Sequence, residues 1–316
     1  MADTGDRWKG YLRTTAKILS VLVVALLAAL ILNFVFLAIV FAYFLATGGS
    51  VDQAITSFTD SMRSIWFMLG TTITQEIAWV LVPVAFVVLV DRKRFSWREL
   101  GLQFGSRGAK LFLAGIALNA LLGIAIVGTI ALTGWQQVEI DGISAYGLAT
   151  VAGYLALTAV LMLAVGIGEE TLFRGYIQTD LMHKYGNLPA LIVTSAIFAT
   201  IHIVMLISGQ EVSPLSIFNI FIASLVMGYL YIITGSIMAS IGFHFFQDFL
   251  AAGMFLTGDL PYDSYPLFLF SNAGDTTLFG INLGSMDNLI NLFWFVVLLA
   301  GLYVYHRWHR KRASEG

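Results

Sequence analysis

The 316-residue chain contains no cysteine. Disulfide bonds, a thiol nucleophile, iron–sulfur clusters and zinc sites with cysteine ligands are therefore excluded. Charge is scarce as well, because Asp, Glu, Lys and Arg make up 11% of the residues, against roughly 25% in soluble domains. The net charge of −2 lacks the basic excess by which nucleic-acid-binding proteins attract phosphates, so we expect no nucleic-acid partner.

Apolar residues dominate the rest of the composition. They make up 58% of the chain, and the mean hydropathy is +0.84. Eight apolar stretches are long enough to cross a hydrocarbon core of about 30 Å. The sequence therefore predicts an all-α fold, a polytopic membrane helical bundle with about eight transmembrane helices. The predicted spans are 18–46, 64–90, 109–133, 148–168, 189–207, 215–234, 236–256 and 288–306.

The basic residues predict the orientation of these helices, since Lys and Arg accumulate in cytoplasmic connections. If the N- and C-termini both lie in the cytoplasm, every basic residue except Arg63 falls in or next to a cytoplasmic segment. An even number of spans agrees with this arrangement. We expect a multi-pass protein of the cell membrane, in contact with the lipid bilayer along most of its length.

Ionisable side chains inside apolar spans are costly, so each is expected to have a partner or a function. Here they gather in three short segments, and in each segment two marked side chains lie four residues apart and hence on one face of a helix. The segments are GEETLFRGY at 168–176, FATIH at 198–202 and HFFQD at 244–248. The pairs are Glu170 with Arg174, Phe198 with His202, and His244 with Asp248.

Each pair by itself has an ordinary explanation, such as a stabilising helix pair or a hydrogen-bonded packing histidine. Three costly groups on three helices from one half of the chain favour a common purpose instead. A carboxylate in a partly dehydrated cavity, a histidine that shares the proton of a water, and groups that polarise a carbonyl are the components of peptide-bond hydrolysis.

The predicted spans place these groups at different depths. Glu169 follows the end of the fourth span, whereas His202 lies about 20 Å and His244 about 12 Å inside their spans at a rise of about 1.5 Å per residue. These depths agree only if the fifth span begins in the cytosol or the fourth is buried beyond its apolar run. We expect a water-filled cavity that opens to the cytoplasmic side.

In this order, the three segments resemble the motifs of the CPBP intramembrane proteases, the CAAX protease or Abi family that includes the Rce1-like enzymes. That family shows Glu-Glu-x-x-x-Arg, then Phe-x-x-x-His, then His-x-x-x-Asn or Asp, on successive helices. The flanking sequences LFRGYIQ, GSIMASIGFH and WRELGL are similar as well. The resemblance covers roughly residues 95–255 and implies an intramembrane endopeptidase.

One integral membrane domain with three parts is expected. Residues 1–108 would form two membrane helices and a cytoplasmic connection, and residues 109–256 the catalytic core. Residues 257–316 would form an external loop, the last span and a basic tail.

The resemblance also implies roles for individual residues. Glu169 would be the general base, His202 would help it to activate the water, and His244 with Asp248 would stabilise the oxyanion. Many members have Asn in place of Asp248, and Asp donates a hydrogen bond only when it is protonated. The residues with structural or orienting roles would be Glu170, Arg174 and Phe198.

The residues leave the use of a metal open. No His-Glu-x-x-His motif of the common zinc proteases occurs. Glu169, His202 and His244 could supply three ligands of an open zinc site, or serve as a base and hydrogen-bond donors without a metal. Of the two, we expect the metal-free site.

The substrate of such a peptidase would be membrane-associated, and a prenylated CAAX-type substrate is one class that the family allows. Two other classes of function stay open. A proton-coupled transporter also places Glu, His and Asp inside the membrane, although the chain shows no inverted repeat. A non-catalytic immunity or scaffold protein would keep the same groups for packing.

Glu76, midway along the second predicted span, is an ionisable residue outside the three motifs. A carboxylate at this depth needs a partner or a function. We expect it either to be capped by a neighbouring donor or to form part of a cavity wall.

Overall fold

The computed structural model describes residues 4–133, 138–139, 141–206, 214–255, 263–270, 275–278 and 281–315. The α-helices are α1 (Thr4–Thr47), α2 (Val51–Ser61), α3 (Ile65–Ala85), α4 (Ser106–Thr133), α5 (Gly142–Tyr146), α6 (Leu148–Glu170), α7 (Thr179–Tyr185), α8 (Asn187–Leu206), α9 (Pro214–Thr234), α10 (Met238–Asp248) and α11 (Met286–Glu315). Three π-helical segments, η1 (Phe86–Val90), η3 (Thr171–Gln178) and η4 (Phe249–Met254), and the 3₁₀ segment η2 (Trp97–Leu100) extend or connect them.

Four short strands lie in the connections. They are β1 (Val138–Glu139), β2 (Leu269–Phe270), β3 (Asp275–Leu278) and β4 (Ile281–Ser285). β1 pairs with β2 and β3 with β4, both antiparallel. The predicted external loop 257–287 lies partly outside the described residues, and its described part contains β2, β3 and β4.

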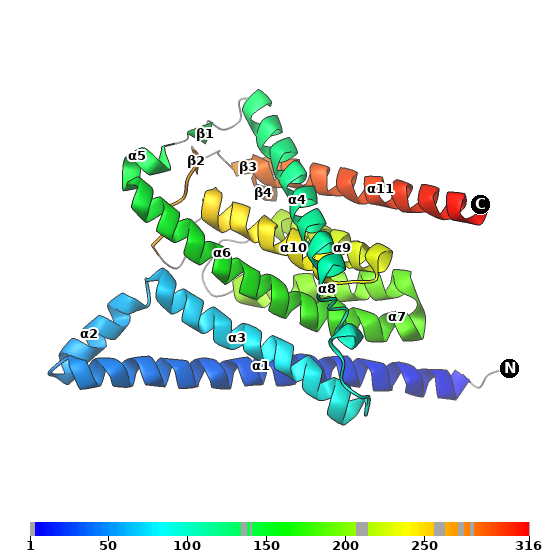
Figure 1. The fold of residues 1–316 in the computed structure, drawn as a ribbon, viewed down its shortest axis with the longest axis horizontal. Coiled ribbons are helices and arrows are strands. Elements are labelled where there is room, and N and C mark those ends of the chain that lie inside the picture. The colour runs from blue at the N-terminus through cyan, green and yellow to red at the C-terminus, as the bar shows by residue number, and fades with distance from the viewer. Residues whose placement is uncertain are drawn as a thin grey trace.

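In the described part of the chain, six helices are long and apolar enough to cross a membrane, which confirms a helical multi-pass membrane protein. They are Trp8–Thr47, Ile65–Val90, Ser106–Thr133, Leu148–Tyr185, Leu215–Thr234 and Leu289–Arg312. The predicted spans 189–207 and 236–256 correspond to α8, whose apolar part is shorter, and to α10 with η4. The count of eight and the cytoplasmic orientation stay predictions, although both termini lie at the same end of the bundle (Figure 1).

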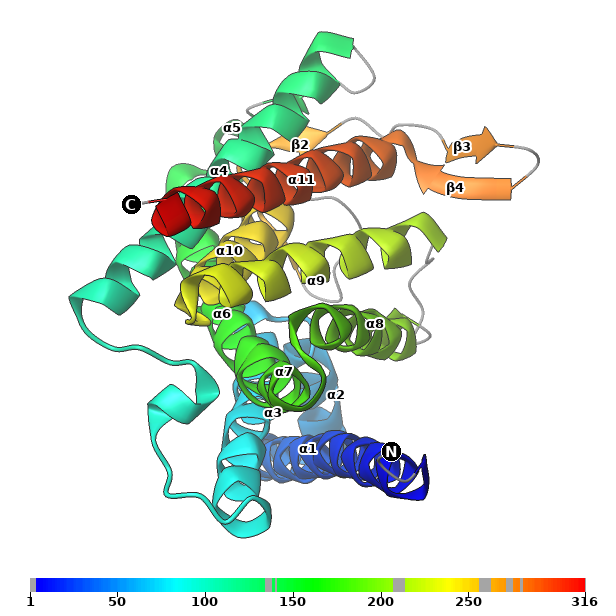
Figure 2. The same ribbon diagram turned by 90° about the vertical axis from the view of Figure 1, so that its right-hand side faces the viewer.

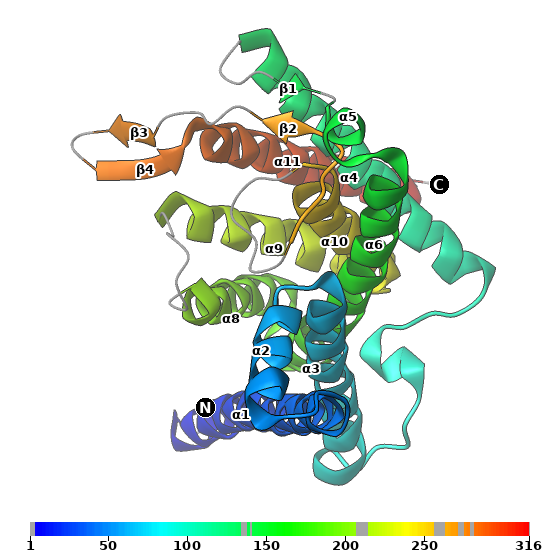
Figure 3. The ribbon, with the colours of Figure 1, turned by 90° about the vertical axis from the view of Figure 1, so that its left-hand side faces the viewer.

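The helices stack in an order that places the three motif segments at the centre. α1 packs on α3, α3 on α6, and α6 on α10, while α10 also packs on α4. α9 lies between α8 and α11. Views from opposite sides show α1 and α3 at one edge of the stack and α11 with α4 at the opposite edge (Figures 2 and 3). The motif segments on α6, α8 and α10 therefore lie in the interior.

The helix that contains the fourth predicted span extends past its predicted end. We predicted that it stops at residue 168, but α6 continues through η3 and α7 as one apolar helix to Tyr185. The polar run after Gly168 stays helical because its side chains are buried against neighbouring helices rather than exposed at a membrane edge. Glu169 therefore lies within a long helix rather than at its end.

Gly186 closes the turn between α7 and α8. Its φ of +83° lies in the left-handed region that favours glycine, and its N–H donates to the Met182 carbonyl oxygen at 3.0 Å. Glu170 lies fifteen residues before Tyr185, and His202 lies fifteen residues after Asn187. At about 1.5 Å per residue, both lie about 22 Å from this turn, so the hairpin carries them to the same level.

An ion-pair cluster ties the N-terminal helix to this hairpin. Lys17 Nζ lies 2.5 Å from Asp91 Oδ1 and 2.8 Å from Asp180 Oδ1. The Tyr176 hydroxyl donates to Asp91 Oδ2 at 3.1 Å. Lys17 is thus a partly buried link between α1, the end of η1 and α7, in addition to contributing to the basic N-terminal segment.

Close contact between α4 and α10 requires two glycines. A Cβ at Gly115 would overlap the Ala239 carbonyl oxygen, and a Cβ at Gly242 would overlap the Phe112 carbonyl oxygen. Small residues at such positions let the backbones of membrane helices approach closely. This contact fixes α10, and with it the HFFQD segment, against α4.

We expect Gly115→Ala and Gly242→Ala each to lower the free energy of unfolding by about 1–3 kcal/mol, because the added methyl group forces the helices apart. Gly128→Ala on α4 is the matched control, since a Cβ there meets no atom within 4 Å. Thermal unfolding in detergent measures the effect. A melting temperature of either variant equal to that of Gly128→Ala would contradict the close packing.

Candidate active site

Several of the motif residues lie where α-helical and π-helical segments join. Glu169 and Glu170 end α6, and Arg174 follows on η3. Asp248 ends α10, and η4 begins at the next residue. π-helical turns inside α-helices occur frequently at functional sites. The Thr179 hydroxyl donates to the Arg174 carbonyl oxygen at 3.1 Å, which satisfies a backbone acceptor within the widened turns.

Arg174 and Glu170 form a fully buried ion pair. Arg174 Nη1 donates to Glu170 Oε1 at 2.7 Å, and both side chains are 0% exposed. Arg174 Nη2 donates to the hydroxyl and the carbonyl oxygen of Ser224 at 2.7 and 3.2 Å. The guanidinium also lies 4.5 Å from the centre of the Phe198 ring. Arg174 therefore joins the end of α6 to α8 and α9.

His244 is held between three carboxylates. Its Nδ1 lies 3.0 Å from Glu170 Oε1, where an N–H donates to the carboxylate. Its Nε2 lies 3.3 Å from Asp248 Oδ2 and 3.7 Å from Glu169 Oε2. Because Glu170 occupies the Nδ1 side, the Nε2 side of the ring faces Glu169 and Asp248.

Glu169 is the carboxylate with the fewest protein partners in this cluster. It is 4% exposed, and its Oε2 has no hydrogen-bond partner among the described residues. It lies within electrostatic range of His202, His244 and Asp248. A buried carboxylate that receives so few donors from the protein can accept a proton or a hydrogen bond from water.

Phe198 connects His202 to this cluster. His202 Nδ1 lies 2.9 Å from the Phe198 carbonyl oxygen, so an N–H there donates to it and the neutral ring keeps Nε2 as its acceptor. The two rings lie 4.5 Å apart between centres. The Phe198 ring also lies 5.9 Å from the His244 ring and 4.9 Å from the Phe173 ring. Phe198 thus contacts both histidines and orients them.

The structure brings all seven predicted site residues into one region, and it adds Ser224, which the sequence reasoning missed. Ser224 and Gly228 lie four residues apart on α9, a spacing of small residues that is typical of membrane-helix contacts. The Gln178 side chain donates to the Gly228 carbonyl oxygen at 2.9 Å. In the sequence, this spacing of small residues was the signal that could have predicted which face of α9 packs against η3.

The side chains proposed as metal ligands are of suitable types but are not grouped as a ligand set. Within the described residues, no group of three or more His, Asp or Glu side chains is arranged so that it could hold a metal ion. Glu169, His202 and His244 belong to the described residues. Both histidines instead use Nδ1 within the protein, His244 toward Glu170 Oε1 and His202 toward the Phe198 carbonyl oxygen.

Residues 150–250 match the family model described as type II CAAX prenyl endopeptidase Rce1-like. The match covers about a third of the chain, begins in the first turn of α6 and includes all three motif segments. Over these residues, the match confirms the resemblance to Rce1-like enzymes that the three motifs indicate. No match was found among curated proteins or among solved structures.

We expect Arg174→Met to lower the free energy of unfolding by about 3–5 kcal/mol, because it leaves the Glu170 carboxylate buried without its cation. Lys184→Met is the matched control. Lys184 pairs with Asp180 at the same spacing and distance, 2.7 Å, but its side chain is 38% exposed, and exposed pairs contribute about 0–1 kcal/mol. Chemical unfolding in detergent compares the two. Equal losses would contradict the importance of the buried pair, and Glu170→Gln in the Arg174→Met background should recover part of the loss.

Proposed function

Because residues 150–250 carry an Rce1-like domain, we propose that this protein is an intramembrane endopeptidase that hydrolyses a peptide bond of a membrane-associated substrate. The observation that carries the proposal is the orientation of His244. Glu170 binds its Nδ1 side, and its Nε2 side faces Glu169 and Asp248 inside the matched segment.

In the proposed reaction, Glu169 accepts a proton from a water whose oxygen attacks the carbonyl carbon of the peptide bond. His202 assists by accepting a hydrogen bond from the same water. The electron pair of the carbonyl π bond moves to the oxygen, and the Nε2–H of His244, which faces Asp248 in the free protein, donates to the resulting oxyanion. Hydrogen bonds of this kind strengthen as charge develops in a site that excludes bulk water.

The second step breaks the C–N bond. Glu169 returns its proton to the leaving nitrogen, so that one water is consumed and the products are a carboxyl and an amine terminus. In the free protein Asp248 Oδ2 lies 3.3 Å from His244 Nε2, where it accepts the Nε2–H and holds the ring until the charged substrate oxygen takes over this hydrogen bond. This role for Asp248 needs only an acceptor, which removes the need for a protonated Asp at a position where many relatives have Asn.

We propose a membrane-anchored protein or peptide as the substrate, with a prenylated CAAX-type C-terminus as the first class to test, since the matched family model carries that description. The site would open toward the cytoplasmic side of the cell membrane. The proposed chemistry uses only the side chains of Glu169, His202, His244 and Asp248, each in a role that a hydrogen bond or a proton transfer can fill.

We expect Glu169→Gln, His202→Ala and His244→Ala each to lower kcat/KM at least about 100-fold, because each removes a group that handles a proton or the oxyanion. The assay is cleavage of fluorogenic peptides, with and without prenyl groups, by the purified protein in liposomes. Glu99→Gln is the control, since Glu99 is an exposed residue of a connection. Cleavage that persists in Glu169→Gln would refute the mechanism. Absence of cleavage by the wild type, together with proton-coupled uptake, would favour a transporter.

Cleavage should survive treatment with a strong zinc chelator, because no step of the proposed reaction requires a metal. A zinc protease assayed in the same liposomes serves as the control and should lose its activity. Loss of cleavage that added zinc restores would show that the reaction depends on a metal.

A further inference from the structure

Glu76 is a buried carboxylate on α3, outside the segment that matches the family model. It is 4% exposed. The neighbouring Gln75 side chain donates to its Oε1 at 3.1 Å, whereas its Oε2 has no hydrogen-bond partner among the described residues. A neighbouring donor therefore caps one oxygen of Glu76 but not the other. Glu76 also lines a cavity, so it is part of a cavity wall as well.

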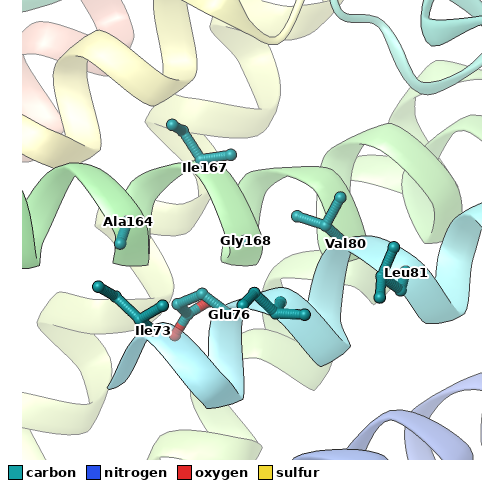
Figure 4. Close-up of a pocket in the computed structure, with 8 residues that line it drawn as sticks. Ile73, Glu76, Val80, Leu81, Ala164, Ile167 and Gly168 are labelled. Atoms are coloured by element: carbon teal, nitrogen blue, oxygen red, sulfur yellow. The ribbon is translucent and has the colours of Figure 1, made fainter. Parts of the chain in front are cut away.

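Glu76 reaches α6 because residue 168 is a glycine. The Glu76 carboxyl contacts Gly168 so closely that a Cβ there would overlap Oε2. Figure 4 shows the Glu76 side chain between the two helices, next to Gly168. The next residue of α6 is Glu169, and Glu76 lies within electrostatic range of Glu169, His244 and Asp248.

The other surroundings of Glu76 are apolar. A cavity of about 290 Å³ between α3 and α6 is lined by side chains that include Ile73, Ile77, Val80 and Ile167. None of these can donate a hydrogen bond to a carboxylate. The side of Glu76 that faces this cavity therefore offers its Oε2 no donor.

Three buried glutamate oxygens, Glu76 Oε2, Glu169 Oε2 and Glu170 Oε2, thus lack donors among the described residues. Glu170 is already held through its Oε1 by Arg174 and His244, whereas Glu169 has no such partner. Buried polar atoms are nearly always hydrogen-bonded, through protein or ordered water. One water has two O–H groups and can donate to both Glu76 Oε2 and Glu169 Oε2. Such a bridge would fix the rotation of the Glu169 carboxyl group.

We propose that Glu76 is a positioning residue for Glu169, joined to it by a bridging water that donates to the Oε2 atoms of both side chains. The bridge leaves the other Glu169 oxygen directed at the substrate water. This inference rests on the proposed peptidase function, and it assigns a role in that reaction to the N-terminal half of the chain.

The first test is Glu76→Gln, which keeps the size of the side chain but replaces one acceptor oxygen by a donor NH₂ group. We expect kcat to fall about tenfold or more, as when a catalytic group is misplaced, while KM changes less than about twofold and the melting temperature stays the same. Glu76→Asp keeps the carboxylate and should retain more kcat than Glu76→Gln. Ile77→Val, in the same cavity wall, is the control for packing.

The second test displaces Glu76 without changing it. Gly168→Ala places a methyl group where the Glu76 carboxyl lies, so kcat should fall as in Glu76→Gln. Gly153→Ala on the same helix is the matched control, because a Cβ there meets no atom within 4 Å. A further fall in the Glu76→Gln/Gly168→Ala double variant should be small, since both changes act on the same bridge.

The outcomes separate the two proposals. If the wild type cleaves and Glu76→Gln cleaves with the same kcat, the role of Glu76 is refuted while the peptidase function stands. An equal fall in Glu76→Gln and Glu76→Asp, accompanied by a lower melting temperature in both, would show that Glu76 is only structural. If the wild type cleaves none of the peptides, the peptidase function fails and the role of Glu76 fails with it.

Discussion

Glu170 Oε1 accepts hydrogen bonds from two groups at once, Arg174 and His244, and the arrangement of the site depends on this shared oxygen. A buried carboxylate is costly unless it is paired and hydrogen-bonded. Arg174 supplies the pairing charge, and Ser224 supplies two further acceptors to the guanidinium. The ion pair thereby fixes the atom against which the His244 ring is oriented. The two adjacent glutamates have different surroundings, because Glu170 is occupied by structural partners and Glu169 is not.

The long helix from Leu148 to Tyr185 is the second constraint. It carries a charged pair at its middle, which is possible only because η3 is buried by α3, α8 and α9. The turn at Gly186 then returns the chain so that His202 lies level with Glu170. A shorter fourth helix, such as the apolar run suggests, would leave Glu169 and the two histidines at different depths.

The N-terminal helices contribute more than a membrane anchor. α3 packs along α6 and places Glu76 against Gly168, and Lys17 on α1 binds Asp180 on α7. The N-terminal helices, which lie outside the family match, therefore contact the long helix Leu148–Tyr185 at two places, Gly168 beside the site and Asp180 near the turn. A glycine next to Glu169 is what allows a fourth carboxylate, Glu76, to approach Glu169, Glu170 and Asp248.

The sequence by itself determined the membrane class, most helix positions and the residues of the candidate site. Long apolar runs must be helical in a bilayer, because their backbone groups have no other partners there, and costly ionisable groups inside them stand out against that background. What only the tertiary structure decided is the burial of the polar run 169–178, the partner Ser224 and the approach of Glu76 to Gly168. Hydropathy counts each residue alone, whereas the stability of a buried charge is set by partners on other helices, and those partners are known only once the helices are packed.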